Sequence, residues 1–206
     1  MTSYTYDPQA AHDADTGAGN KYISDTGAYV GKIVKVTGKK TSKGGDSLNI
    51  AFEADDGRKA DYLTLQVCSA TGEKYYGYGV FMAVLRCAGV RVAESKVMKD
   101  GTLEFPGLEG KPIGIVVQAT EYLKNVKDDS GRVISQEVAT RPELVAAFSA
   151  KTRQMAIELD KQQPATAVDR MLATLQAVRP MKKKANGQAA PAASASPDFV
   201  DSDVPF

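Results

Sequence analysis

Three strand-like runs, separated by two short turns, most constrain the fold of this chain, and two of them alternate between apolar and polar residues. In the run "SLNIAFEA", residues such as Ile50 and Phe52 fall on one face, while polar or small residues fall between them. The run "KADYLTLQV" alternates in the same way, and an earlier β-branched run begins at Tyr29. The intervening turns, 42–46 and 55–58, contain the glycines that tight turns favour. The pattern therefore predicts a three-stranded meander with one face in a core.

The period of the pattern then changes. Apolar residues recur at helical spacing before a natural stop at Gly89, namely at Val80, Phe81, Val84, Leu85 and Ala88. Two further strands are predicted around a turn at 127–132, the first of them at 113–123. Three strands, a helix and two strands is the element order of a five-stranded Greek-key OB barrel. We therefore expect a mainly β, OB-like barrel with a helix between strands 3 and 4, although a general α+β sheet shares much of this order.

The composition changes along the chain and predicts five segments. Residues 1–28 are predicted to be an irregular lead-in, and 29–140 the OB-like domain. Residues 141–181 are helical in character and predict a small appendage packed on the barrel. The Ala-, Ser- and Pro-rich stretch 182–197 predicts a disordered linker before an acidic tip at 198–206. The apolar stripe of the appendage consists of Met171, Leu172, Leu175 and Val178.

The overall composition argues against several classes of protein. The 206 residues carry a net charge of +1, and no stretch approaches the length of a membrane span. Cys68 and Cys87 lie in apolar stretches without a CxxC spacing, which is typical of buried thiols in a reducing compartment. His12 is the single histidine, and no metal-ligand spacing, phosphate-binding loop or nucleophile motif occurs. We expect a cytoplasmic protein that is not an enzyme and has no cofactor, metal or membrane partner.

Basic and aromatic residues gather in the predicted meander and just after it. The lysines are Lys32, Lys35, Lys39, Lys40 and Lys43, and the tyrosines are Tyr62, Tyr75, Tyr76 and Tyr78. Single-stranded nucleic acid is bound by such a combination, because bases stack on aromatic rings while cations follow the backbone. A solvated edge strand also explains the lysines, and loop packing against the helix also explains the tyrosines. Tyr122 and Phe52 are the next candidates for stacking.

The final nine residues, "DFVDSDVPF", alternate acidic and apolar residues and stop on an aromatic. They resemble the tails of bacterial single-stranded DNA-binding proteins, which end in an acidic run followed by Ile-Pro-Phe. Ser202 interrupts the acidic run, valine replaces isoleucine, and the tryptophans common in that family are absent. The resemblance implies a partner-binding tip formed by Asp201, Asp203, Val204, Pro205 and Phe206.

The block "GKIVKVTGKKTSKGGDSLNIAFEADDGRKADYLTL" resembles phage-encoded proteins found beside recombination and replication genes, some of which are single-stranded DNA-binding proteins. The resemblance covers about residues 22–180. Together the two resemblances imply a phage single-stranded DNA-binding protein that acts in DNA replication and recombination in the bacterial cytoplasm. Its acidic C-terminal tail would recruit replication and recombination proteins. The alternative is a protein–protein adaptor or phage structural protein without nucleic-acid binding. The sequence leaves open a homo-oligomer and a preference for RNA over DNA.

Overall fold

The computed structural model describes residue 8 and residues 21–128 and 130–181. Its first three strands, β1 (Gly27–Lys40), β2 (Asp46–Ala54) and β3 (Lys59–Cys68), form the predicted antiparallel meander. The two turns hold Gly44 and Gly57 at positive φ, 81° and 85°, a conformation that glycine adopts without steric cost. Alternate residues of β2 and β3 are buried, as the period of two predicts.

Helix α2 (Tyr76–Cys87) follows β3 and packs its apolar face into the main core. The helix starts directly against β3: a Cβ atom on Gly77 would lie 2.3 Å from the carbonyl oxygen of Gln66. Only glycine permits this approach, so Gly77 fixes where the helix begins. The predicted stop is also confirmed, because Gly89 has a φ of 71° just beyond the helix.

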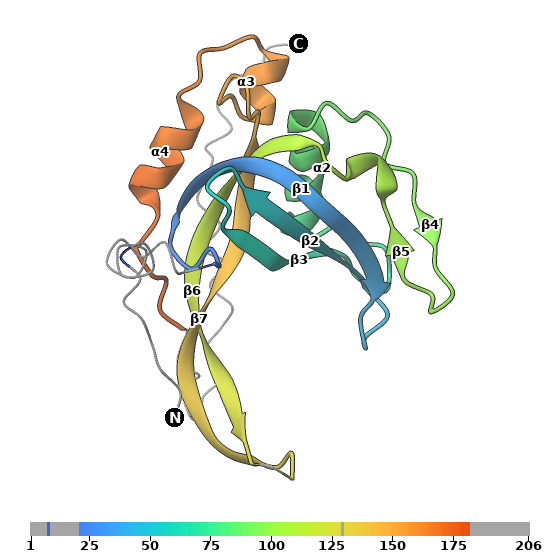
Figure 1. Cartoon of the computed structure of the whole chain (residues 1–206). Helices are drawn as coiled ribbons and strands as arrows, with labels where there is room; N and C mark the ends of the chain where they lie inside the picture. The colour runs from blue at the N-terminus through green and yellow to red at the C-terminus, as the bar shows by residue number, and fades with distance from the viewer. Residues whose placement is uncertain (1–7, 9–20, 129, 182–206) are drawn as a thin grey trace.

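The sheet continues on the other side of β1. The short strands β4 (Lys96–Val97) and β5 (Leu103–Glu104) form a hairpin beside β1 and lead into the 3-10 turn η1 (Pro106–Leu108). Strand β6 (Pro112–Lys127) then pairs with β1 and with β7 (Val133–Phe148). The protein is therefore mainly β, with one antiparallel sheet in which the long strands follow the order β3-β2-β1-β6-β7. The far half of the β6–β7 hairpin projects from the body as an arm (Figure 1).

The predicted helical region at 141–181 begins too early. Residues 141–148 form the second half of β7, where Leu144, Ala147 and Phe148 are buried. Their alanines suggest a helix by local propensity, but pairing with β6 buries the same residues in the sheet. Only α3 (Ala156–Asp160) and α4 (Ala167–Thr174) are helical in this region.

Helix α4 covers a second, smaller core, whereas Ala156 and Leu159 of α3 pack against the main core. The buried members of the second core are Val116, Phe148 and Val168, against which Met171, Leu172 and Leu175 pack. Three members of the predicted stripe therefore make the expected contact, whereas Val178 is exposed.

The lead-in was also predicted too long, because Ile23 is buried in the main core and its N–H donates to the carbonyl of Lys59.

The sequence predicted a five-stranded OB-like barrel. The structure does not confirm it, because the sheet is not closed. β3 and β7 contact each other, yet no strand ladder joins them in the described part of the chain. Pro142 of β7 lies opposite Ala119 of β6. The backbone of Ala119 bonds to Thr26 and Arg179 and not to β7, so this is a non-hydrogen-bonded pair and the backbone nitrogen of Pro142 points away from β6, towards β3. Because proline has no N–H, β7 cannot donate a hydrogen bond to β3 at this position. The gap left between β3 and β7 is the site described next.

Candidate nucleic-acid interface

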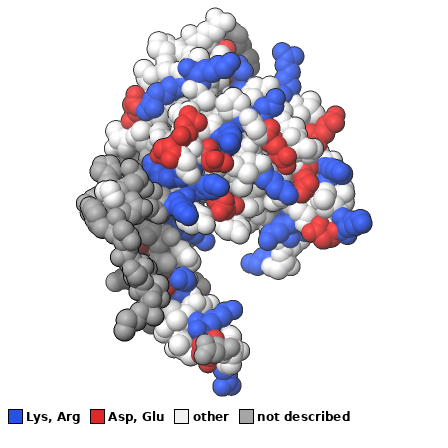
Figure 2. Space-filling view, in the orientation of Figure 1, with Lys and Arg blue, Asp and Glu red and all other residues white. Residues whose placement is uncertain are grey.

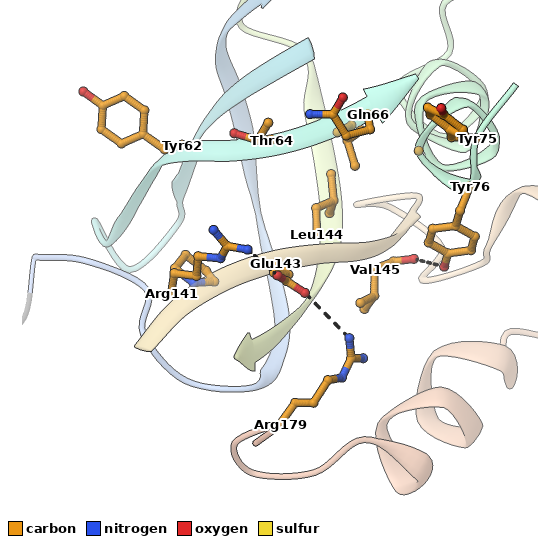
Figure 3. Close-up of a pocket in the computed structure, with 13 residues that line it drawn as sticks. Tyr62, Thr64, Gln66, Tyr75, Tyr76, Arg141, Glu143, Leu144, Val145 and Arg179 are labelled. Carbon is orange, nitrogen blue, oxygen red and sulfur yellow. Dashed lines mark hydrogen bonds and ion pairs between the residues drawn. The ribbon is translucent and has the colours of Figure 1, made fainter. Parts of the chain in front are cut away.

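A hollow of about 530 Å³ separates β3, the start of α2 and the proximal half of β7. Figure 3 shows it as a channel with β3 on one side and β7 with Arg179 on the other. We call it the first hollow. Its lining consists of Tyr62, Thr64, Leu65, Gln66, Tyr75, Tyr76, Gly77, Arg141, Pro142, Glu143, Leu144, Val145 and Arg179.

The β3 wall of the first hollow follows from the alternation of the strand. Leu63 and Leu65 point into the core, so Tyr62, Thr64 and Gln66 project from the opposite face. Tyr62 is 80% exposed, which is unusual for a large aromatic side chain. Because alternate residues of a strand are about 6.7 Å apart, the three side chains form a row about 13 Å long.

Two more tyrosines stand at the start of α2. Tyr75 is the residue before the helix and Tyr76 its first residue, and both are exposed. The Tyr76 hydroxyl donates a 2.7 Å hydrogen bond across the hollow to the carbonyl of Val145 on β7. Because this hydroxyl lies against β7, loss of solvation raises the pKa of Tyr76, while the positive charge of Arg179 acts in the opposite direction. The ring of Tyr76 itself remains open to the hollow.

The opposite wall carries an acid between two arginines. The Glu143 carboxylate accepts a hydrogen bond of 3.1 Å from Arg141 and lies 3.6 Å from the guanidinium of Arg179. Arg179 lies beyond α4, yet its backbone is fixed to β6: its N–H donates to Ala119 and its carbonyl accepts from Glu121. The two cations of this wall are therefore supplied by separate parts of the chain.

A second hollow of about 620 Å³ adjoins the first. The two share Tyr62, Thr64, Arg141 and Pro142, and we call them together the β3–β7 cleft. The second hollow adds the side chains of Tyr22, Lys59 and Tyr122. The Arg141 guanidinium lies 5.4 Å from the centre of the Tyr122 ring, within the range of a cation–π contact. The cleft thus combines aromatic rings and cations along its length.

The predicted lysines lie elsewhere. None of Lys32, Lys35, Lys39, Lys40 and Lys43 lines either hollow. Register places Lys35 and Lys39 on the same outer face of the meander as Tyr62, but in β1, with β2 between them and β3. The sequence showed no acid among these lysines, yet neighbouring strands supply acids in space.

Three of the five lysines form ion pairs: Lys32 with Glu53 at 3.7 Å, Lys35 with Glu104 at 2.5 Å, and Lys40 with Asp46 at 2.8 Å. The hydrogen bond that Lys35 donates to the Glu104 carboxylate raises the pKa of Lys35. Acidic and basic side chains are interspersed over the face drawn in Figure 2. The lysine strand is therefore not a purely basic surface, and its role in nucleic-acid binding stays a prediction.

The structure also separates the other candidates. Tyr78 packs partly against the main core under the ammonium group of Lys74, 4.3 Å from the ring centre, and lines neither hollow. Phe52 is fully buried, so the suggestion that it stacks on bases was wrong. Tyr122 does line the cleft. The tip residues Asp201, Asp203, Val204, Pro205 and Phe206 lie outside the described residues.

The sequence reasoning missed the cations of the cleft. Arg141 and Glu143 fell in a segment predicted to be helical, and Arg179 follows the last helix without any local pattern. Lys59 was overlooked although it is the first residue of the alternating run of β3. Correct extension of β7 through residue 148 would have placed Arg141 opposite β3, whereas no local signal identifies Arg179.

Within the described residues there is no group of three or more His, Cys, Asp and Glu side chains that could hold a metal ion. In the same part of the chain, no helix combines the length and the hydrophobicity needed to cross a membrane. No protein-family model matches the sequence, and a search of curated proteins finds no match. The interpretation of the cleft therefore depends on its geometry and chemistry.

Proposed function

We propose that the protein binds single-stranded DNA in the β3–β7 cleft, with little preference for base sequence. The observation that carries this proposal is the lining of the first hollow, where Tyr62, Tyr75 and Tyr76 share one space with Arg141 and Arg179. Every base has a face that stacks on an aromatic ring, and a guanidinium attracts the phosphate backbone. Sites of this composition tolerate sequence because stacking does not read base edges.

The polypeptide path supports the same proposal. We propose that the protein is an OB-like fold left open between β3 and β7. A meander, a helix and a two-stranded hairpin occur in the OB order, and β1 pairs with both β2 and β6. OB folds bind nucleic acids on the face of strands 2 and 3, between flanking loops. Tyr62 projects from this face of β3, and the β6–β7 arm takes the place of the loop between the last two strands.

Duplex DNA suits the cleft less well than a single strand. The rings of Tyr62 and Tyr75 are exposed, but a base can stack on them only if its own face is exposed. In a duplex those faces are covered by neighbouring base pairs, so binding would require unstacking at a cost of a few kcal/mol. We therefore expect a clear preference for single strands.

We further propose that the tip at 198–206 recruits replication and recombination proteins in the cytoplasm of a bacterial host, as the tail resemblance implies. Phe206 offers an aromatic ring, and Asp201 and Asp203 offer negative charge to a basic rim. A short peptide of this kind binds weakly and exchangeably, because its ordering entropy is lost on docking.

The direct test is a fluorescence-anisotropy titration of the full chain with a labelled oligo(dT), an unrelated mixed sequence and a duplex of equal length. We expect similar affinities for the two single strands and much weaker binding of the duplex. If about three to five cations contact phosphates, log K should fall with log salt with a slope of about −2 to −3.5. Absence of binding to single strands at low salt would leave the adaptor or structural role as the better explanation.

A further inference from the structure

Glu143 occupies the space between the two cations that face the first hollow. One of its carboxylate oxygens lies 3.1 Å from Arg141 and the other 3.6 Å from Arg179. These arginines come from different parts of the chain, β7 and the segment after α4. Figure 3 shows Arg141 and Glu143 along β7, with Arg179 directed at Glu143, and Tyr62, Thr64 and Gln66 along β3. Two guanidinium groups that share one anion in an open cleft have the arrangement of an anion site.

Both arginines make contacts that do not involve the carboxylate, Arg141 through its side chain and Arg179 through its backbone. The guanidinium of Arg141 lies over the Tyr122 ring, and the backbone of Arg179 makes two hydrogen bonds to β6, of 2.7 Å and 2.9 Å. The side chains of Arg141, Arg179 and Glu143 remain 58%, 47% and 33% exposed. A diffusing anion can therefore reach the pair. If Glu143 turns away, Arg141 keeps its contact with Tyr122 and the backbone of Arg179 keeps its hydrogen bonds to β6.

Phosphate is the anion that the cleft chemistry favours. A guanidinium presents a planar set of donors that fits a phosphate as well as a carboxylate, and charge-assisted bonds to either are of similar type. The aromatic residues across the hollow would hold bases, so the backbone of the same strand has to run along the opposite wall. A phosphodiester between Arg141 and Arg179 satisfies both requirements.

We propose that one phosphate of the bound single strand lies between Arg141 and Arg179 and displaces the Glu143 carboxylate. Glu143 is then a resident competing anion, which lowers affinity by occupying the site when nucleic acid is absent and by repelling the phosphate when it is present. This inference rests on the proposed binding of single-stranded DNA. It adds a phosphate position and an affinity-limiting residue to that function.

The test compares the full chain with its Glu143→Gln variant in salt-dependent anisotropy titrations with oligo(dT). The variant no longer has to break two exposed ion pairs when DNA binds, so its affinity for oligo(dT) should be about two- to thirtyfold higher at low salt. The slope of log K against log salt should become steeper by about 0.7, the contribution of one phosphate on a single strand. The matched control is Asp160→Asn, which removes the same charge from an ion pair with Arg86 and lines neither hollow.

A second comparison tests whether the effect of Glu143 on binding depends on Arg179. In an Arg179→Gln background, Glu143→Gln should tighten binding less than it does in the parent, because one of the two cations has been removed. Parent-like or weaker binding by Glu143→Gln would overturn the inference and leave Glu143 as a residue that orients the arginines. Equal tightening by Asp160→Asn would also overturn it, because net charge alone would then explain the effect. If the parent itself fails to bind oligo(dT), the proposed function fails, and the inference fails with it.

Discussion

Replacing Tyr62 by alanine separates base stacking from folding. The side chain is 80% exposed, and its neighbour Leu63 supplies the core contact of this part of β3. No cavity is created, so the free energy of unfolding should change by no more than about 0.5 kcal/mol. Loss of one stacked base costs about 1–3 kcal/mol, which corresponds to about five- to 150-fold weaker binding of single-stranded DNA.

The assay is anisotropy with oligo(dT) at one fixed salt concentration, together with urea unfolding of the same preparations. Tyr62→Phe is the matched control, because it keeps the ring and should bind within about twofold of the parent. Equal binding by Tyr62→Ala and the parent would refute stacking at this position. Equal losses in Tyr62→Ala and Tyr62→Phe would show that the hydroxyl group, and not the ring, makes the contact.

Three further changes test the fold and the tip. Gly77→Ala should destabilise the protein by about 1–3 kcal/mol in urea unfolding, because the added Cβ would lie 2.3 Å from the Gln66 carbonyl oxygen. Gly79→Ala is the control: its Cβ would have open space, so the free energy of unfolding should stay the same or increase. Burial raises the pKa of Glu158, but hydrogen bonds from Thr166, Met155 and Ala167 outweigh it and hold the pKa below its ordinary value. The charged form therefore stabilises the fold at neutral pH, and this contribution is lost as the pH falls through the folded-state pKa. Glu158→Gln should cost about 1–3 kcal/mol at neutral pH, and a gap to the parent that stays constant down to about pH 3 would contradict this reasoning. Deleting residues 198–206 should leave DNA binding unchanged or slightly tighter at low salt and abolish capture of replication and recombination proteins in a pull-down; identical partner sets would refute the tip as a binding peptide.

Periodicity predicted the central part of the fold well. The strict alternation of β2 and β3 and the helical spacing in α2 reflect burial of one face, which is a local property of the sequence. The same alternation placed Tyr62 on the outer face, and the structure leaves it exposed there. Turn glycines such as Gly44 and Gly57 were also predictable, because their backbone conformation is encoded locally.

Long-range pairing could not be predicted in the same way. Residues 141–148 favour a helix by composition, and only pairing with β6 makes them a strand. The ion pairs of Lys32, Lys35 and Lys40 join residues brought together by strand register, so the lysine run appeared more basic in the sequence than it is in space. Arg179 reaches the cleft through backbone bonds to Ala119 and Glu121, which no sequence spacing indicates.

The central claim is that single-stranded DNA lies in the β3–β7 cleft, and backbone amide NMR during an oligo(dT) titration tests it most directly. The account predicts that the largest shift changes fall on β3 around Tyr62 to Gln66, on Tyr75 to Gly77, on Arg141 to Val145 and on Arg179, which together line the first hollow. Shift changes confined to the lysines of β1 and the turn after it, with the cleft residues unaffected, would contradict the claim. They would indicate that DNA binds at the lysine strand instead.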